Sequence, residues 1–222
     1  MQKLAVDLKA VGAESTIIGI DLGKDGAAAD LTRDIETRGL AVDVLINATG
    51  LGANGPFGET DPDRIATMLQ VNVVALTELT RLMLPGMVAR QRGSVLLVAS
   101  TAAFQPGPQM AVYCASKAYI LSFGEAIAYE MRGTGVTVTT LCPGPTATGF
   151  AHSADAEGTA LFTGIVPVMQ SAEVARIGYR GLKAGRAVVV TGLLNNIFAI
   201  SGRISPPSMS LPIVNWMMQR GR

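Results

Sequence analysis

Three short apolar segments, each followed at once by a polar or glycine-containing turn, constrain the fold of this chain more than any other feature. The segments span residues 44–46, 94–99 and 135–141, and helix-like stretches separate them. Strands that alternate with helices build a parallel sheet with helices on both faces, and such sheets bind ligands beyond the carboxyl ends of their strands. The sequence therefore predicts a doubly wound α/β domain whose three turns lie on one edge of the sheet.

The remaining elements are predicted from apolar spacing and from capping residues. Asp61 and Pro62 form a favourable helix start, and Asp34 and Arg38 form an i,i+4 pair on another helix. Helices are expected before Gly12, from residue 27 to Gly39, from 62 to beyond 84, over 111–132 and over 171–184, with further strands at 15–20 and 187–191.

Tyr113 and Lys117 lie four residues apart in the predicted helix 111–132 and therefore share one helix face. A phenol titrates near ~10, and a cation held beside it lowers that pKa, which lets the tyrosine exchange a proton with a substrate oxygen. Ser100 follows strand 94–99 at the predicted sheet edge, where its hydroxyl can hydrogen-bond the same oxygen. Together the three residues indicate proton transfer coupled to hydride transfer at an alcohol or a ketone.

These motifs resemble those of the short-chain dehydrogenases/reductases of the classical type. They follow the family's order over residues 21–150: Asp21-Leu22, Leu45-Ile46-Asn47-Ala48-Thr49-Gly50, Val71-Asn72-Val73, Ser100, Tyr113 to Lys117, and Pro143 to Thr148. The resemblance implies a Rossmann-like fold and an oxidoreductase that interconverts a ketone and a secondary alcohol. It implies four catalytic residues, namely Tyr113 as acid/base, Lys117 beside it, Ser100 on the carbonyl, and Asn72 in a proton relay with water.

The resemblance also implies a nicotinamide cofactor, NADP or NAD with NADP preferred. The implied contacts are Asp21, Leu22, Asn47, Ala48, Thr49, Gly50, Tyr113, Lys117, Pro143, Gly144, Thr146 and Thr148. Asp21 would approach the adenine, and the segment from Pro143 to Thr148 would grip the nicotinamide carboxamide and phosphate. The family carries Asn-Asn-Ala-Gly where this chain has Asn47-Ala48-Thr49-Gly50, so one amide is missing and one hydroxyl is added.

The start of the chain departs from the family pattern. The family opens with a strand, a glycine-rich turn that holds the cofactor's pyrophosphate, and a helix, and no such turn precedes residues 15–20 here. In a doubly wound sheet the first strand is central, so its loss leaves unpaired backbone groups. We therefore expect an incomplete N-terminal region that lacks the first two strands and the glycine-rich loop. Strands 15–21 and 43–47 should then flank a gap or a displaced segment.

Composition argues against several classes of function. A chain of 222 residues with 49% apolar and 16% charged residues suits a single domain over 1–222, and a net charge of +1 without a basic block argues against nucleic acid. His152 is the only histidine, which disfavours a Ser-His-Asp hydrolase and a zinc site. Cys114 and Cys142 are interpreted as buried thiols of a cytoplasmic protein. No apolar run approaches the ~18 residues of a membrane span.

Residues 193–222 form an apolar C-terminal extension with three possible roles. It can pack on the domain or on a neighbouring subunit of a homo-oligomer, cover an apolar substrate, or contact a membrane surface through Trp216 and the terminal arginines. Segment 149–166 takes the place of the family's substrate loop, and Phe150 and Phe162 within it indicate an apolar carbonyl or alcohol substrate.

Two other functions stay open from sequence alone. One is a catalytically inactive remnant without the phosphate loop. The other is an extended relative, such as a sugar-nucleotide epimerase, which shares the Tyr-x-x-x-Lys spacing. The short stretch after Lys117 leaves little room for the larger substrate domain of that relative.

Overall fold

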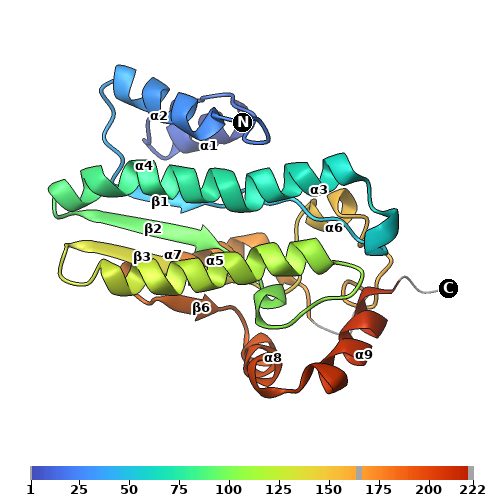
Figure 1. Ribbon diagram of the computed structural model, residues 1–222. Coiled ribbons are helices and arrows are strands. Elements are labelled where there is room, and N and C mark those ends of the chain that lie inside the picture. The colour runs from blue at the N-terminus through green and yellow to red at the C-terminus, as the bar shows by residue number, and fades with distance from the viewer. Residues whose placement is uncertain (1, 164–166, 220–222) are drawn as a thin grey trace.

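The computed structural model describes residues 2–163 and 167–219, and its centre is a parallel sheet of four strands (Figure 1). The strands are β1 (Val44–Asn47), β2 (Gly93–Val98), β3 (Val136–Cys142) and β6 (Val188–Val190), in the spatial order β1-β2-β3-β6. Val44 pairs with Ser94, Gly93 with Val136, and Thr140 with Val188. The predicted parallel α/β sheet is confirmed.

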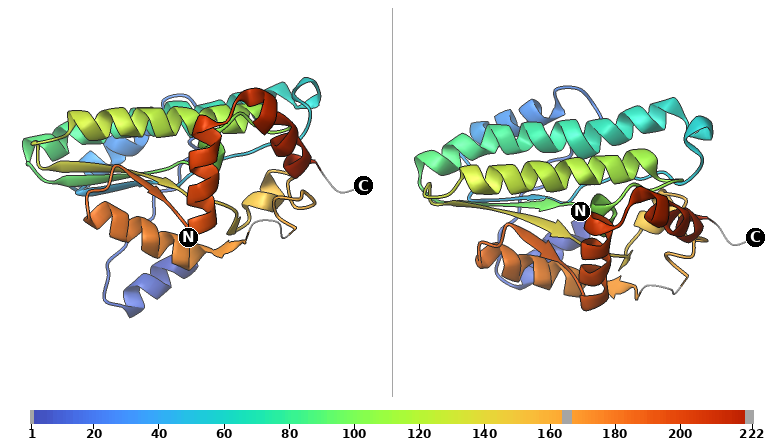
Figure 2. Two further views of the ribbon diagram at one scale, coloured as in Figure 1. Left: turned by 90° about the horizontal axis from the view of Figure 1, so that it is seen from below. Right: turned by 60° about the horizontal axis from the view of Figure 1, so that its bottom comes forward.

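Helices cover both faces of this sheet, as the two views of Figure 2 show. One face carries α4 (Leu76–Ala89) and α5 (Ala111–Glu130), with α2 (Ala27–Thr37) packed on the outside of α4. The other face carries α7 (Ser171–Lys183), and α1 (Gln2–Ala10), which buries no side chain, lies on the same side. The main core lies between the sheet and α4 and α5, where Met87, Val95, Leu97 and Ile120 are fully buried.

Close contact between α5 and β3 depends on Gly124. A Cβ atom at that position would overlap with the hydroxyl of Thr140, which lies on β3. The helix that bears Tyr113 and Lys117 can therefore approach the sheet closely, and this fixes the height of both side chains above the strand ends.

A single long helix runs from Pro62 to Ala89 through three segments: α3 (Pro62–Leu69), the π-helical turn η2 (Gln70–Ala75) and α4. It starts as predicted, since the Asp61 side chain accepts a hydrogen bond from the Asp63 amide at 3.0 Å and Pro62 follows. By length and composition alone this helix could cross a membrane. Here it is packed against α2, α5 and β2 and forms part of the core.

The predicted strand at residues 15–20 is wrong. Residues 13–20 form no regular element, and Ile17 and Ile20 are largely exposed. A strand needs a neighbour to bond its backbone, and none of the described strands lies beside this segment. The expected gap inside the sheet is also not present: the four strands form an uninterrupted sheet that excludes residues 15–20, and β1 is an edge strand paired only with β2.

The remaining elements gather at the carboxyl edge of the sheet. They are η1 (Phe57–Glu59), η3 (Thr101–Phe104), the short parallel pair β4 (Thr146–Ala147) and β5 (Met169–Gln170), α6 (Phe150–Ser153), α8 (Leu193–Ile204) and α9 (Pro207–Met218). α8 and α9 follow one another at this edge and run in different directions (Figure 2). The described part of the extension 193–222 is therefore two helices packed on the domain.

Candidate active site

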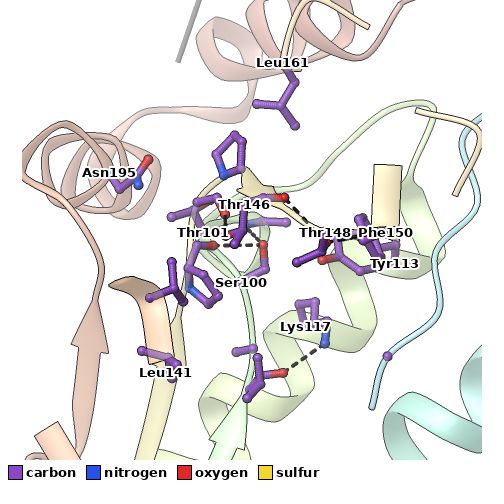
Figure 3. Close-up of a pocket in the computed structure, with 18 of the residues that line it drawn as sticks. Ser100, Thr101, Tyr113, Lys117, Leu141, Thr146, Thr148, Phe150, Leu161 and Asn195 are labelled. Carbon is purple, nitrogen blue, oxygen red and sulfur yellow. Dashed lines mark hydrogen bonds between the residues drawn. The ribbon is translucent and has the colours of Figure 1, made fainter. Parts of the chain in front are cut away.

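The turns that follow β1, β2 and β3 meet around one cavity of about 530 Å³, as the sequence predicted (Figure 3). The turns are tied together, since the Thr101 amide donates to the Pro143 carbonyl at 2.8 Å. Ser100 begins η3, and its hydroxyl oxygen accepts from the Ala102 amide at 3.1 Å. This bond fixes the Ser100 oxygen at the wall of the cavity.

Tyr113 lies in the first turn of α5, and its ring packs on Phe150 with 5.1 Å between the ring centroids. Burial raises the pKa of Tyr113 to about 12, while a hydrogen bond to Ser100 acts in the opposite direction. The net shift is therefore opposite to the lowering that was expected from Lys117. The ring is enclosed by apolar groups, so its charged form is disfavoured.

The position of the Lys117 ammonium group explains why its charge does not offset the effect of burial on the pKa of Tyr113. Its Nζ donates to the Val98 carbonyl at 2.9 Å and lies 5.7 Å from the centroid of the Tyr113 ring (Figure 3). Burial lowers the pKa of Lys117 to about 8, with the Cys142 thiol acting weakly in the opposite direction. The site thus holds a buried cation that is close to its own titration point.

Asn72 lies in the π-helical turn η2 and is fully buried, but it does not line the cavity. Its Oδ1 accepts from the Leu51 amide, and its Nδ2 donates to the Leu51 carbonyl, both at 2.9 Å, and to Ser116 at 3.0 Å. The amide therefore holds the turn after β1 in place. A Cβ atom on Gly50 in that turn would come within 3.1 Å of Lys117 Nζ.

The structure divides the predicted cofactor contacts into two groups. Those that line the cavity are Ala48, Gly50, Tyr113, Lys117, Pro143, Gly144, Thr146 and Thr148. Those that do not are Asp21, Leu22, Asn47 and Thr49. Asp21 is exposed and accepts from the Gly23 amide, and the buried Asn47 side chain donates to Thr80, so both have local structural bonds here.

The nicotinamide end of an NAD(P) molecule fits the first group. Gly50 and Gly144 leave bare backbone at the cavity wall, and the hydroxyls of Ser100, Thr146 and Thr148 are polar groups in a largely apolar lining. Fewer of the described residues are suited to bind the pyrophosphate end of the cofactor. Gly50 and Gly144 are the glycines that line the cavity, and neither belongs to a glycine-rich turn opening a helix.

Residues of α8 and α9 complete the cavity, and the sequence did not point to them individually. Asn195, Phe198, Val214, Met217 and Met218 line its wall. The Asn195 side chain donates to the Thr191 carbonyl, and a Cβ atom on Gly144 would overlap with its amide. α9 is fixed by the Leu161 amide, which donates to the Met217 carbonyl at 3.0 Å, and by Asn54 Nδ2, which donates to the Met218 carbonyl at 3.1 Å.

The single histidine and the two cysteines are not among the residues that line the cavity. His152 is exposed and faces Glu157, and Cys114 and Cys142 are free and buried, as predicted. Within residues 2–163 and 167–219 no group of three His, Cys, Asp or Glu side chains could hold a metal ion. Part of the predicted substrate loop, residues 164–166, and the terminal Arg220 and Arg222 fall outside the described residues.

A doubly wound parallel sheet with Ser100, Tyr113 and Lys117 at its carboxyl edge defines a Rossmann-type oxidoreductase fold and site. The family model for short chain dehydrogenase matches residues 1–158, and this chain belongs to that family.

Relatives and solved structures agree with this assignment. A short chain dehydrogenase of Pseudocercospora fijiensis is 34% identical over 162 residues, which is 72% of this chain and 52% of the relative. A very-long-chain 3-oxoacyl-CoA reductase of Pyrenophora tritici-repentis is 35% identical over 130 residues, which is 58% of this chain and 38% of the relative. The chain thus spans about half the length, or less, of these curated relatives.

Two solved structures share the fold. A structure described for the stereoselectivity of 7β-hydroxysteroid dehydrogenase matches with a TM-score of 0.82 and 23% identity, covering 96% of this chain and 81% of its own. A short-chain dehydrogenase from Sphingobium yanoikuyae in complex with NADPH matches with a TM-score of 0.78 and 23% identity. The match covers 90% of this chain and 78% of the Sphingobium chain. At these identities the likeness establishes the fold.

Proposed function

We propose that this protein is an NAD(P)-dependent oxidoreductase that interconverts a ketone and a secondary alcohol on an apolar substrate. The observation that supports this best is the convergence of the Ser100 and Tyr113 hydroxyls, with Lys117 beneath them, on one largely apolar cavity. The cofactor, when bound, would supply or accept the hydride.

The residues of this chain divide the remaining work. Tyr113 passes a proton to or from the substrate oxygen, and Ser100 donates a hydrogen bond to that oxygen as charge develops on it. Lys117 places a positive charge below the phenol and can hold the nicotinamide ribose. Asn72 acts through the turn after β1, because its amide bonds fix Leu51 beside Gly50.

The substrate class follows from the cavity wall around Tyr113. Met110, Phe150, Leu161 and Met217 line it, and they favour an aliphatic or ring-shaped body next to the carbonyl. The 3-oxoacyl-CoA reductase among the relatives acts, by its name, on such a molecule. A sugar nucleotide would leave most of its polar groups without partners in this lining.

Three further properties belong to the proposal, namely the cofactor, the location and the assembly. The cofactor is NADP or NAD, since the solved neighbours include an NADPH complex and an NAD complex. Two free buried thiols suit a cytoplasmic protein. A homo-oligomer is proposed because Leu82 on α4 and Tyr119 and Tyr129 on α5 expose apolar surface on the outside of the domain.

The decisive variant is Tyr113→Phe. Removing the phenol oxygen should lower kcat for ketone reduction at least ~10²-fold, because a positioned acid/base is lost, while the ring and its packing on Phe150 stay. Steady-state kinetics with an aliphatic ketone and NADPH measure this, and circular dichroism checks folding. Turnover within a factor of three of the parent would refute the assignment.

A second candidate, an inactive member of the family, is favoured by one observation: no glycine-rich turn at a helix N-terminus lines the described cavity. Calorimetric titration of the 222-residue chain with NADPH and with NADH separates the two. Weak binding or none is the result expected for the inactive member, because the pyrophosphate then lacks backbone donors. Low-micromolar binding would show that other residues supply them and would favour the active enzyme.

A further inference from the structure

Both C-terminal helices carry a stripe of large apolar side chains that points away from the domain. On α8 it consists of Leu193, Ile197, Ile200 and Ile204, and on α9 of Met209, Ile213 and Trp216. The spacing is four, three and four residues on α8 and four and three on α9, which puts each set on one helix face, and each residue is more than half exposed. We call these seven residues the outer stripe.

The outer stripe is not required for packing on the domain, because each helix has a separate inner face. The inner faces hold the buried residues, which are Asn195 and Ala199 on α8 and Ser210, Val214 and Met218 on α9. Gly202 lets α8 approach the Phe104 carbonyl closely, and α9 is held by its bonds to Leu161 and Asn54. The helices are therefore anchored, and each presents an exposed apolar face of the kind that marks an interaction site.

The charge of this part of the chain indicates what covers that surface. Of the 17 acidic residues none follows Glu173, whereas seven basic residues do. The seven are Arg176, Arg180, Lys183, Arg186, Arg203, Arg220 and Arg222. Arg203 is paired with Glu125 at 3.0 Å, whereas Arg220 and Arg222 follow α9 in a stretch of sequence without acidic residues. An apolar helix face that is followed in the sequence by basic residues alone complements anionic lipid headgroups above acyl chains.

A second copy of this chain fits the same surface less well. A two-fold contact through the outer stripe would bring two basic C-terminal ends together, and the carboxylate of Glu125 is already paired with Arg203. Trp216 adds a further preference, since indole rings favour the boundary between headgroups and hydrocarbon.

We propose that the outer stripe docks on the surface of an anionic lipid bilayer, with α8 and α9 lying in the interface. The same helices line the cavity on their other side, through Asn195, Phe198, Val214 and Met217. Docking therefore places the wall of the cavity next to the lipid. The proposal does not depend on turnover, so it can fail or succeed independently of the proposed function.

Trp216 is the only tryptophan of the chain and lies on the outer stripe, so it reports docking directly. The 222-residue protein is titrated with vesicles of phosphatidylcholine and phosphatidylglycerol, and with vesicles of phosphatidylcholine alone. We expect a blue shift of the emission and quenching by brominated acyl chains with the anionic vesicles. Affinity should be at least ~10-fold lower for the neutral ones and should fall as salt is added.

Matched variants distinguish docking through the outer stripe from non-specific adsorption to the vesicles. Ile200→Asp combined with Ile213→Asp should lower anionic-vesicle affinity by at least ~10-fold, because two apolar anchors become charged, while Trp216 stays as the reporter. Val6→Asp removes an equally exposed apolar side chain from α1, which buries no side chain, and should leave binding unchanged.

Three results would overturn the proposal. One is equal binding of the parent to both vesicles, and another is equal loss of binding in the Ile200→Asp/Ile213→Asp and Val6→Asp variants. The third is a concentration-dependent blue shift and dimer in size-exclusion chromatography without lipid, which would assign the outer stripe to a second copy. The parent measurement stands even if a variant fails to fold.

Discussion

At the scale of single residues, the site is built at a cost to stability. Lys117 is an almost fully buried cation whose hydrogen bond in the structure goes to the Val98 carbonyl. A buried ammonium group without a carboxylate beside it disfavours the folded state, and this is why its pKa falls to about 8. The protein keeps a destabilising charge at the place where the proposed chemistry needs one.

Lys117→Met should therefore stabilise the folded protein near pH 7, by an amount on the order of 3 kcal/mol at most. The folded pKa of Lys117 is about 8, below the ordinary value of 10.5. Below pH 8 the charged lysine lowers the free energy of unfolding by the full amount. Between pH 8 and 10.5 this destabilisation declines, because the folded state loses the proton before the unfolded state does. Above pH 10.5 it vanishes.

The measurement is thermal unfolding of the parent and of Lys117→Met at pH 6, 7, 9 and 10. We expect a higher Tm for the methionine variant at pH 6 and 7 and a difference that narrows at pH 9 and 10. Lys117→Arg serves as the control, since it keeps the charge at every pH. A lower Tm for Lys117→Met at all four values would contradict a buried, destabilising ammonium group.

At the scale of elements, prediction from sequence worked where the signal is local. Segments 44–46, 94–99 and 135–141 are rich in aliphatic and β-branched residues, and Tyr113, Lys117 and Ser100 belong to a recognisable motif. Residues 15–20 carry the same apolar pattern, but a strand forms only beside a partner, and the pattern holds no information on that.

The site was incompletely predicted for a related reason. Asn195 and Met217 reach the cavity from helices far along the chain, and no motif marks them. The raised pKa of Tyr113 comes from burial beneath Phe150, which lies beyond the reach of the Tyr-x-x-x-Lys spacing. Contacts between distant segments decide both, and one sequence does not contain them.

The close packing of α5 on β3 gives a prediction about Gly124. Gly124→Ala should destabilise the protein by roughly 1–3 kcal/mol, because the new methyl overlaps with Thr140 and crowds Leu97. Gly86→Ala in α4 is the matched control. Its methyl meets only the flexible end of Arg90, so the gain in helix propensity should stabilise by up to ~1 kcal/mol.

Urea unfolding of the two variants provides both values, and opposite signs are the expected result. Because α5 carries the site, Gly124→Ala should also lower kcat by more than Gly86→Ala does. Stabilisation by both alanines would mean that the contact between α5 and β3 can relax without strain.

At the scale of the whole molecule, the strands of the sheet differ in how well their backbone is shielded from solvent. β3 lies between two strands, whereas β1 pairs with β2 alone and leaves the side chains of Val44 and Ile46 about half exposed. No described strand bonds the outer side of β1, so this edge is open to water or to another chain.

Hydrogen exchange should reveal this asymmetry. Amides of Leu45 to Asn47 should exchange at least ~10-fold faster than those of Val138 to Thr140, which lie in the centre of the sheet. Exchange followed by mass spectrometry or NMR measures both segments in one sample, and the α5 amides serve as a slow reference. Equal protection of β1 and β3 would mean that the outer side of β1 is covered in solution.

The wide turn at Gln70–Ala75 has one more consequence. A π-helical turn holds one residue more than an α-helical turn, so it amounts to a one-residue insertion in the path of the long helix. Deleting a single residue there would close the turn and rotate everything on one side of it by ~100°. The Asn72 amide would swing away from Leu51, although Ser100, Tyr113 and Lys117 stay untouched. Spacing along this helix, and not only the identity of the side chains, thus encodes the site.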